Sequence, residues 1–77
     1  MKGFIKTHGN KAVTIQTENK TQYYAPIYEL EYIIIQILNT KACINVTFDE
    51  DRTKYSGHSN GKARYYANNV QLCHIIY

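Results

Sequence analysis

Three stretches of the chain, residues 3–6, 12–16 and 22–25, are predicted to be short strands, and residues 12–16 alternate between apolar and polar side chains. A two-residue period is typical of half-buried strands, because successive side chains point to opposite faces of a sheet. The intervening residues 8–11 and 18–21 contain glycine, asparagine and other polar residues that favour turns. The first third of the chain is therefore predicted to be a meander of three short strands.

Residues 26–39 allow two interpretations. Pro26 suits the first position of a helix, where its missing N–H group costs nothing. The apolar residues that recur at helical spacing are Ile27, Leu30, Ile34, Ile37 and Leu38. Residues 32–35, however, are β-branched or aromatic, which favours a strand. We favour a helix of two to three turns, and the alternative is a hairpin that turns at residues 39–41.

The second half of the chain predicts further strands. Residues 42–48 alternate, so that Ile44, Val46 and Phe48 share one face. Residues 49–62 are polar and contain two glycines, which predicts a long mobile loop or the tip of a hairpin. Residues 63–66 and 70–77 are predicted as closing strands, with a break at residues 67–69.

Three strands, a short helix or crossover, and a closing set of strands are the order of an OB-fold barrel. We therefore predict a mainly β protein, with a small five- to six-stranded barrel that forms a single domain over residues 1–77. The predicted core consists of the apolar residues on the inner faces: Ile5, Val13, Ile15, Leu30, Ile34, Ile44, Val46, Phe48, Val70 and Leu72.

The length and charge of the chain restrict its function. Seventy-seven residues form one core and leave no room for a second domain. The net charge is +3, with basic ends around an acidic middle segment. In a barrel whose first and last strands meet, the two ends would merge into one basic patch. The eight tyrosines are typical of strands whose rings are half buried.

Cys43 and Cys73 are too few for a disulfide framework and are expected to be small, buried apolar residues. The chain opens without the apolar run of a signal peptide. Its most apolar stretch, residues 32–38, is too short to cross a bilayer. These features predict a cytoplasmic protein that does not enter a membrane.

We expect neither a metal site nor catalysis. The candidate metal ligands Cys43, His58, Cys73 and His74 lack the paired spacing of zinc sites, and adjacent strand residues 73 and 74 should point apart. The sequence shows no nucleophile–base–acid combination and no glycine-rich phosphate loop. We therefore predict a protein that is not an enzyme and uses no cofactor.

Basic and aromatic residues form the strongest candidate for a site. Single-stranded nucleic acids are bound by cations along their backbone and by flat rings that stack on their bases. Tyr23 and Tyr24 must face opposite sides of a strand, as must Tyr65 and Tyr66, so one ring of each pair belongs to the core. The candidate binding residues are Lys6, His8, Lys11, Tyr24, Arg64 and Tyr66.

The chain resembles the cold-shock domain family over nearly its whole length. The family begins with Gly-x-Val-Lys, where this chain has residues 3–6, and Ile15 matches the isoleucine at the end of the family's first RNA-binding motif. Residues 23–26 stand in the place of its second motif, Val-Phe-Val-His. Its later Val-x-Phe and Ala-x-Asn-Val motifs correspond to residues 46–48 and 67–70.

The resemblance implies an OB-fold barrel that binds single-stranded nucleic acid by stacking bases on one face. The positions that correspond to the stacking face of the family hold Thr7, His8, Ala12, Thr14, Tyr24 and Pro26. Among these positions, only Tyr24 and His8 carry a ring that can stack. The family's glycine-flanked aromatic motif is not present.

Two functions from different classes follow. The first is a binding module for single-stranded RNA or DNA. The second is a protein of the kind found in phages or mobile elements, which binds a host protein through the same β surface. The last strand, residues 70–77, is apolar to its end, so an exposed edge there would allow a homodimer to form by strand pairing.

Overall fold

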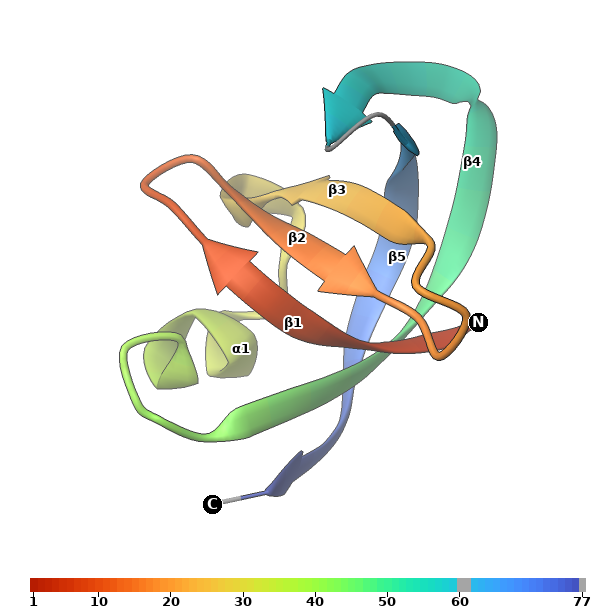
Figure 1. Cartoon of the computed structure of the whole chain (residues 1–77). Coiled ribbons are helices and arrows are strands. Elements are labelled where there is room, and N and C mark those ends of the chain that lie inside the picture. The colour runs from red at the N-terminus through yellow and green to blue at the C-terminus, as the bar shows by residue number, and fades with distance from the viewer. Residues whose placement is uncertain (60–61, 77) are drawn as a thin grey trace.

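The computed structural model describes the backbone of residues 1–59 and 62–76, and the side chains of residues 1–51, 53 and 64–76. The strands form one closed barrel in the order β1-β2-β3-β5-β4, as Figure 1 shows. Neighbouring strands are antiparallel except β3 and β5, which are parallel. The protein is therefore a small OB-like barrel, as predicted. Its strands are β1 (Lys2–His8), β2 (Ala12–Gln16), β3 (Gln22–Pro26), β4 (Cys43–Ser59) and β5 (Lys62–Ile76).

The first three strands form the predicted meander. Its first turn is closed by a hydrogen bond from the Gly9 N–H to the Ala12 carbonyl, at 2.9 Å. The second turn places Lys20 at a φ of 67°. β1 continues to His8, which the sequence had assigned to the turn. Lys6 has no partner in the register between β1 and β2, because the pairing shifts between Ile5 and Thr7.

β1 lies very close to β2 at Gly3. A Cβ atom at Gly3 would lie 2.8 Å from Cγ2 of Ile15 and 2.9 Å from the carbonyl oxygen of Gln16. Ile15 is fully buried and has no room to move. Only glycine therefore fits here, and this close approach lets β1 pair with β2 on one side and with β4 on the other.

The segment between β3 and β4 is helical, so the helix interpretation is confirmed and the hairpin alternative is wrong. A 3₁₀ turn η1 (Ile27–Glu29) precedes a short helix α1 (Tyr32–Ile37). The backbone between them is extended, which makes the helix shorter than predicted. Ile34 is fully buried and anchors α1 against one end of the barrel (Figure 1).

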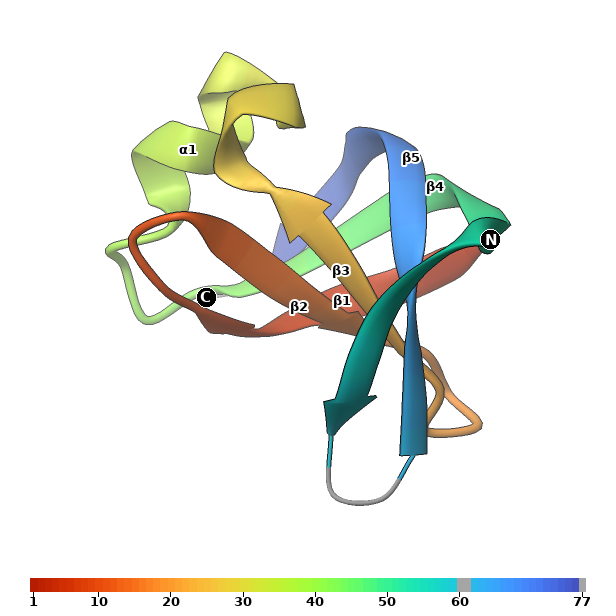
Figure 2. The ribbon, with the colours of Figure 1, turned by 90° about the horizontal axis from the view of Figure 1, so that it is seen from above.

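β4 and β5 are much longer than the sequence pattern predicted. The predicted loop at residues 49–62 is wrong, because β4 continues to Ser59 and β5 begins at Lys62. The hairpin-tip alternative is confirmed, although residues 60 and 61 lie outside the described residues. The paired ends form a two-stranded ribbon that extends past the barrel (Figure 2). Backbone pairing continues here without apolar alternation, which explains why the pattern indicated a loop.

The predicted break at residues 67–69 is also wrong, because β5 runs through it without interruption. The register changes there from Asp49 opposite Asn68 to Thr47 opposite Gln71, so β5 holds one extra residue. Asn69 takes a φ of 54° at this point. The asparagines that suggested a turn therefore form a bulge, which bends the strand while the pairing with β4 resumes.

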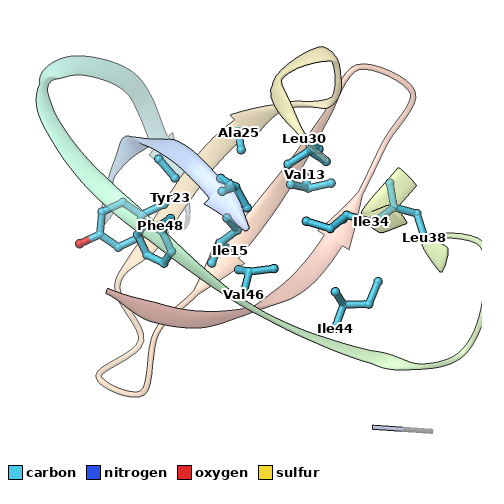
Figure 3. Packing of buried hydrophobic residues seen from close by; sticks show 12 residues of the cluster. Val13, Ile15, Tyr23, Ala25, Leu30, Ile34, Leu38, Ile44, Val46 and Phe48 are labelled. Carbon is cyan, nitrogen blue, oxygen red and sulfur yellow. The ribbon is translucent and has the colours of Figure 1, made fainter. Parts of the chain in front are cut away.

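The core lies inside the barrel and under α1 (Figure 3). Eight of the ten predicted core residues are buried, and Ile5 and Leu72 are only partly buried against the others. The core also contains four residues outside the predicted ten, of which Leu38 belongs to the apolar series of the predicted helix: Tyr23, Ala25, Leu38 and Ala67. Ala25 and Ala67 are small, and small side chains fit where strands approach each other inside a narrow barrel.

The outer edge of β5 is partly covered. The Leu72 N–H donates a hydrogen bond to Oε1 of Glu31 at 2.7 Å, and Glu31 immediately precedes α1. Homodimer formation through this edge stays a prediction. A second copy of the chain would have to pair beside the hydrogen bond between Leu72 and Glu31, or replace it. Among the described residues, no helix is long and apolar enough to cross a membrane.

Candidate functional site

The four tyrosines of β3 and β5 divide between the two faces of the barrel wall. Tyr23 is 1% exposed and packs on Phe48, with their ring centroids 4.8 Å apart. Its hydroxyl donates a hydrogen bond to the carboxylate of Glu50. Tyr65 is partly buried against the core. Tyr24 and Tyr66 therefore point outward, as the alternation predicted.

The parallel register of β3 and β5 brings these outward rings together. Tyr24 lies opposite Tyr66, with their ring centroids 5.1 Å apart and their planes at 59°. Cζ of Arg64, two residues earlier on β5, lies 5.3 Å from the centroid of the Tyr24 ring. This is the geometry of a cation–π contact. We call Tyr24, Arg64 and Tyr66 the tyrosine–arginine cluster.

Arg64 is held in place within this cluster. Its side chain is half buried, and its Nε atom is covered without a hydrogen-bond partner among the described residues. The guanidinium is therefore packed beside the Tyr24 ring and does not extend freely into solvent. A buried N–H donor without a partner costs free energy, and here that cost accompanies the packing of the guanidinium beside the ring.

A groove of about 530 Å³ begins at the two outward rings. Lys11, in the turn between β1 and β2, lies along it and is exposed. The carbonyl of Lys11 accepts a hydrogen bond from the Ile27 N–H at 2.9 Å, which joins this turn to η1. The groove therefore combines rings, a fixed turn and a cation. Its lining residues are Asn10, Lys11, Tyr24, Pro26, Ile27, Tyr28 and Tyr66.

Polar residues continue the outer face beside the cluster. Thr14 lies opposite Tyr24, and Gln22 lies opposite Arg64. Nε2 of Gln22 donates a hydrogen bond to Oε1 of Gln16 at 3.4 Å. Amide and hydroxyl groups at these places can donate to and accept from the edges of a bound base or from a peptide backbone.

One acidic residue lies next to the cluster. Asp51 is opposite Tyr66 in the pairing of β4 with β5. Its Oδ1 accepts a hydrogen bond from the Thr53 N–H at 3.0 Å, and its Oδ2 accepts one from Nδ2 of Asn68 at 3.0 Å. Its charge opposes any anion bound at Tyr66, so an anionic ligand should favour the Lys11 side of the groove.

The structure brings together four of the six predicted site residues: Lys11, Tyr24, Arg64 and Tyr66. His8 does not join them, because it lies opposite the inward-facing Val13 and lines a separate hollow beside α1 with Ile35 and Leu38. Lys6 is exposed at the irregularity of β1, two strands away from Tyr24. Among the side chains that the structure describes, Lys11 lines this groove and Arg64 packs beside the Tyr24 ring, so the predicted merging of the basic ends is seen there in these two residues.

The sequence prediction missed Tyr28, which lines the groove and is 83% exposed. One signal could have identified it. In the predicted helix, Tyr28 falls outside the apolar series that begins with Ile27 and Leu30. An aromatic residue on the polar side of such a segment indicates a binding role as well as a packing role.

The cysteines are not the buried residues that the sequence predicted. Cys43 and Cys73 are both exposed and free. The expectation that Cys73 and His74 point apart is also wrong, since Sγ of Cys73 lies 3.5 Å from Nδ1 of His74. Cys73 is the extra residue of a bulge against β4, which turns its side chain out of the normal alternation. Among the side chains described, no three histidine, cysteine or acidic residues cluster as a metal site would require, and the side chain of His58 lies outside that set.

Comparisons of the chain with protein-family models, with curated proteins and with solved structures found no significant match. The resemblance to cold-shock domains therefore stays a hypothesis that rests on the residues quoted for it. The groove and the tyrosine–arginine cluster are the features of the structure from which a function can be inferred.

Proposed function

We propose that this protein binds single-stranded nucleic acid in the groove beside the tyrosine–arginine cluster and performs no catalysis. The observation that carries the proposal is the outward pair of Tyr24 and Tyr66, with the guanidinium of Arg64 against the Tyr24 ring. Where rings and cations lie together on the barrel wall, the rings can stack on the bases of a single strand and the cations can bind its phosphates.

The energetics support this division of roles. A base that stacks on an aromatic ring contributes roughly 1–3 kcal/mol, and this holds for all four bases. Lys11, which lines the groove, and Arg64, which packs beside the Tyr24 ring, supply positive charge near the place where the phosphates of a stacked strand would pass. The rings of Tyr24 and Tyr66 are half buried and pack against each other, so little side-chain entropy is lost on binding.

Mapping by NMR tests the proposal. Titration of ¹⁵N-labelled protein with short oligo-dT and oligo-rU strands should shift the amide signals of Lys11, Tyr24 and Tyr66. Signals from α1 should stay in place, because α1 lies at the end of the barrel. Comparison of the two strands also establishes whether the protein prefers RNA or DNA. Saturable shifts confined to α1, or no shifts with either strand, would contradict the proposal.

The alternative function is binding of a host protein. The observation that favours it is the exposure of large apolar side chains on α1, where Tyr32 is 73% and Ile33 is 44% exposed. Such side chains are enriched at protein interfaces. Capture of a partner from lysate that survives nuclease treatment, and that is lost in the variant Ile33→Asp, would favour this alternative over the first proposal.

A further inference from the structure

Tyr28 is an aromatic residue whose side chain is exposed to solvent. It is 83% exposed, the largest exposed fraction among the large apolar side chains of the described residues. A ring so exposed contributes little to the stability of the fold, because burial of apolar surface is what stabilises folding. Its packing within the domain therefore does not explain why tyrosine stands at this position.

The backbone that carries Tyr28 is nevertheless fixed. The Ile27 N–H donates to the Lys11 carbonyl at 2.9 Å, and the Leu30 N–H donates to the Ile27 carbonyl at 3.0 Å. Leu30 is buried in the core, and Ile27 is partly buried against it. The ring consequently projects from a turn that is anchored on both sides, which is the arrangement of a preorganised contact.

Tyr28 also shares the groove with the tyrosine–arginine cluster. Tyr24, Tyr66 and Tyr28 all line the same hollow, and Pro26, the last residue of β3, lines it as well. Lys11 is a further lining residue, and its backbone is bonded to η1. The groove therefore presents three rings and one lysine along a single path.

We infer that Tyr28 is a third stacking position, so that the groove binds a run of at least about three unpaired nucleotides. This inference rests on the proposed function. Bases stack on the rings of Tyr66, Tyr24 and Tyr28, and the phosphates pass on the Lys11 side.

The test measures binding of labelled oligo-dT strands of about two to eight nucleotides at about 50 mM salt, by fluorescence anisotropy. Tyr28→Ala should weaken binding of the longer strands roughly 5- to 150-fold, the range expected for loss of one stacked base. It should also remove most of the affinity gained as the strand grows beyond two nucleotides. Tyr28→Phe keeps the ring and should bind like the wild type.

Tyr32→Ala is the matched control, because Tyr32 is a similarly exposed tyrosine that does not line the groove. It should leave binding unchanged, and circular dichroism should show all these variants folded. If the wild type binds and Tyr24→Ala weakens binding, but Tyr28→Ala behaves like Tyr32→Ala, the third position is refuted and the proposed function stands. If the wild type binds no strand of any length, both are refuted.

Discussion

A substitution at Tyr24 separates the contribution of base stacking to oligonucleotide binding from the contribution of charge. The Tyr24 ring lies 5.1 Å from the ring of Tyr66 and 5.3 Å from Cζ of Arg64, and its side chain is only half buried. Tyr24→Ala should weaken oligonucleotide binding by roughly 1–3 kcal/mol, because it removes a stacking surface but no charge. The dependence of binding on salt should stay the same. Tyr24→Phe serves as the control and should retain the affinity, and an unchanged affinity for Tyr24→Ala would refute the role of this ring.

A substitution at Phe48 tests how much the packing of one core side chain contributes to stability. Phe48 is 2% exposed and packs against the ring of Tyr23. Phe48→Ala should lower the free energy of unfolding by about 3–5 kcal/mol, since it leaves a cavity between β4 and β3. That is a large part of the stability of so small a domain. The measurement is urea unfolding followed by circular dichroism, and a midpoint close to that of the wild type would contradict the packing described here.

Much of the residue-scale structure could be predicted from alternation. Tyr23 and Tyr24 had to face opposite sides, and the structure confirms which of them is buried. The contact between Tyr24 and Tyr66 was not predictable in this way, because it depends on the parallel register of β3 and β5. That register is set by the topology of the barrel, and no local pattern encodes it.

At the scale of elements, Gly3 controls how β1 crosses the barrel. Gly3→Ala should destabilise the fold by about 1–3 kcal/mol, because the added Cβ would collide with buried Ile15 and with the backbone of Gln16. Gly9→Ala is the matched control. A Cβ at Gly9 would lie 4.0 Å from the nearest atom, the Ala12 carbonyl oxygen, so its stability should stay near that of the wild type. Thermal unfolding of both variants provides the comparison, and equal losses would show that the close approach at Gly3 is unimportant.

The long β4–β5 ribbon is the element that sequence reasoning missed. Its outer part pairs residues 58 and 59 with residues 63 and 62, beyond the barrel. Apolar and polar residues alternate in a strand when one of its faces is buried against a core. A ribbon that extends beyond the core has no buried face, so its sequence shows no such alternation. The helical segment was predictable because Leu30, Ile34 and Leu38 bury one face at helical spacing.

At the scale of the whole molecule, closure of the barrel explains the location of the site. The parallel contact of β3 with β5 joins the first half of the chain to its last strand. It therefore places Arg64 and Tyr66 beside Tyr24, which lies some forty residues earlier in the sequence. The site exists only in the closed barrel, so variants that unfold the barrel should lose binding together with structure.

Most acidic side chains in the middle of the chain accept hydrogen bonds from other parts of the fold. Glu31 accepts a hydrogen bond from the backbone of Leu72, and Glu50 accepts one from the hydroxyl of Tyr23. Asp51 accepts hydrogen bonds from the backbone of Thr53 and from the side chain of Asn68. Lys11, in contrast, is exposed along the groove. This arrangement of charge favours an anionic strand on the Lys11 side of the groove.

The salt dependence of binding shows whether the groove holds a nucleic-acid strand by its phosphates. A fluorescent poly-pyrimidine strand is titrated with the wild type and with Lys11→Ala at increasing salt from about 50 mM. For the wild type, the logarithm of the binding constant should fall linearly with the logarithm of the salt concentration, because phosphate contacts release counterions. Lys11→Ala should reduce that slope by about 0.7, the value for one phosphate contact on a single strand. Absence of binding near 50 mM salt, or binding that does not respond to salt, would contradict the account.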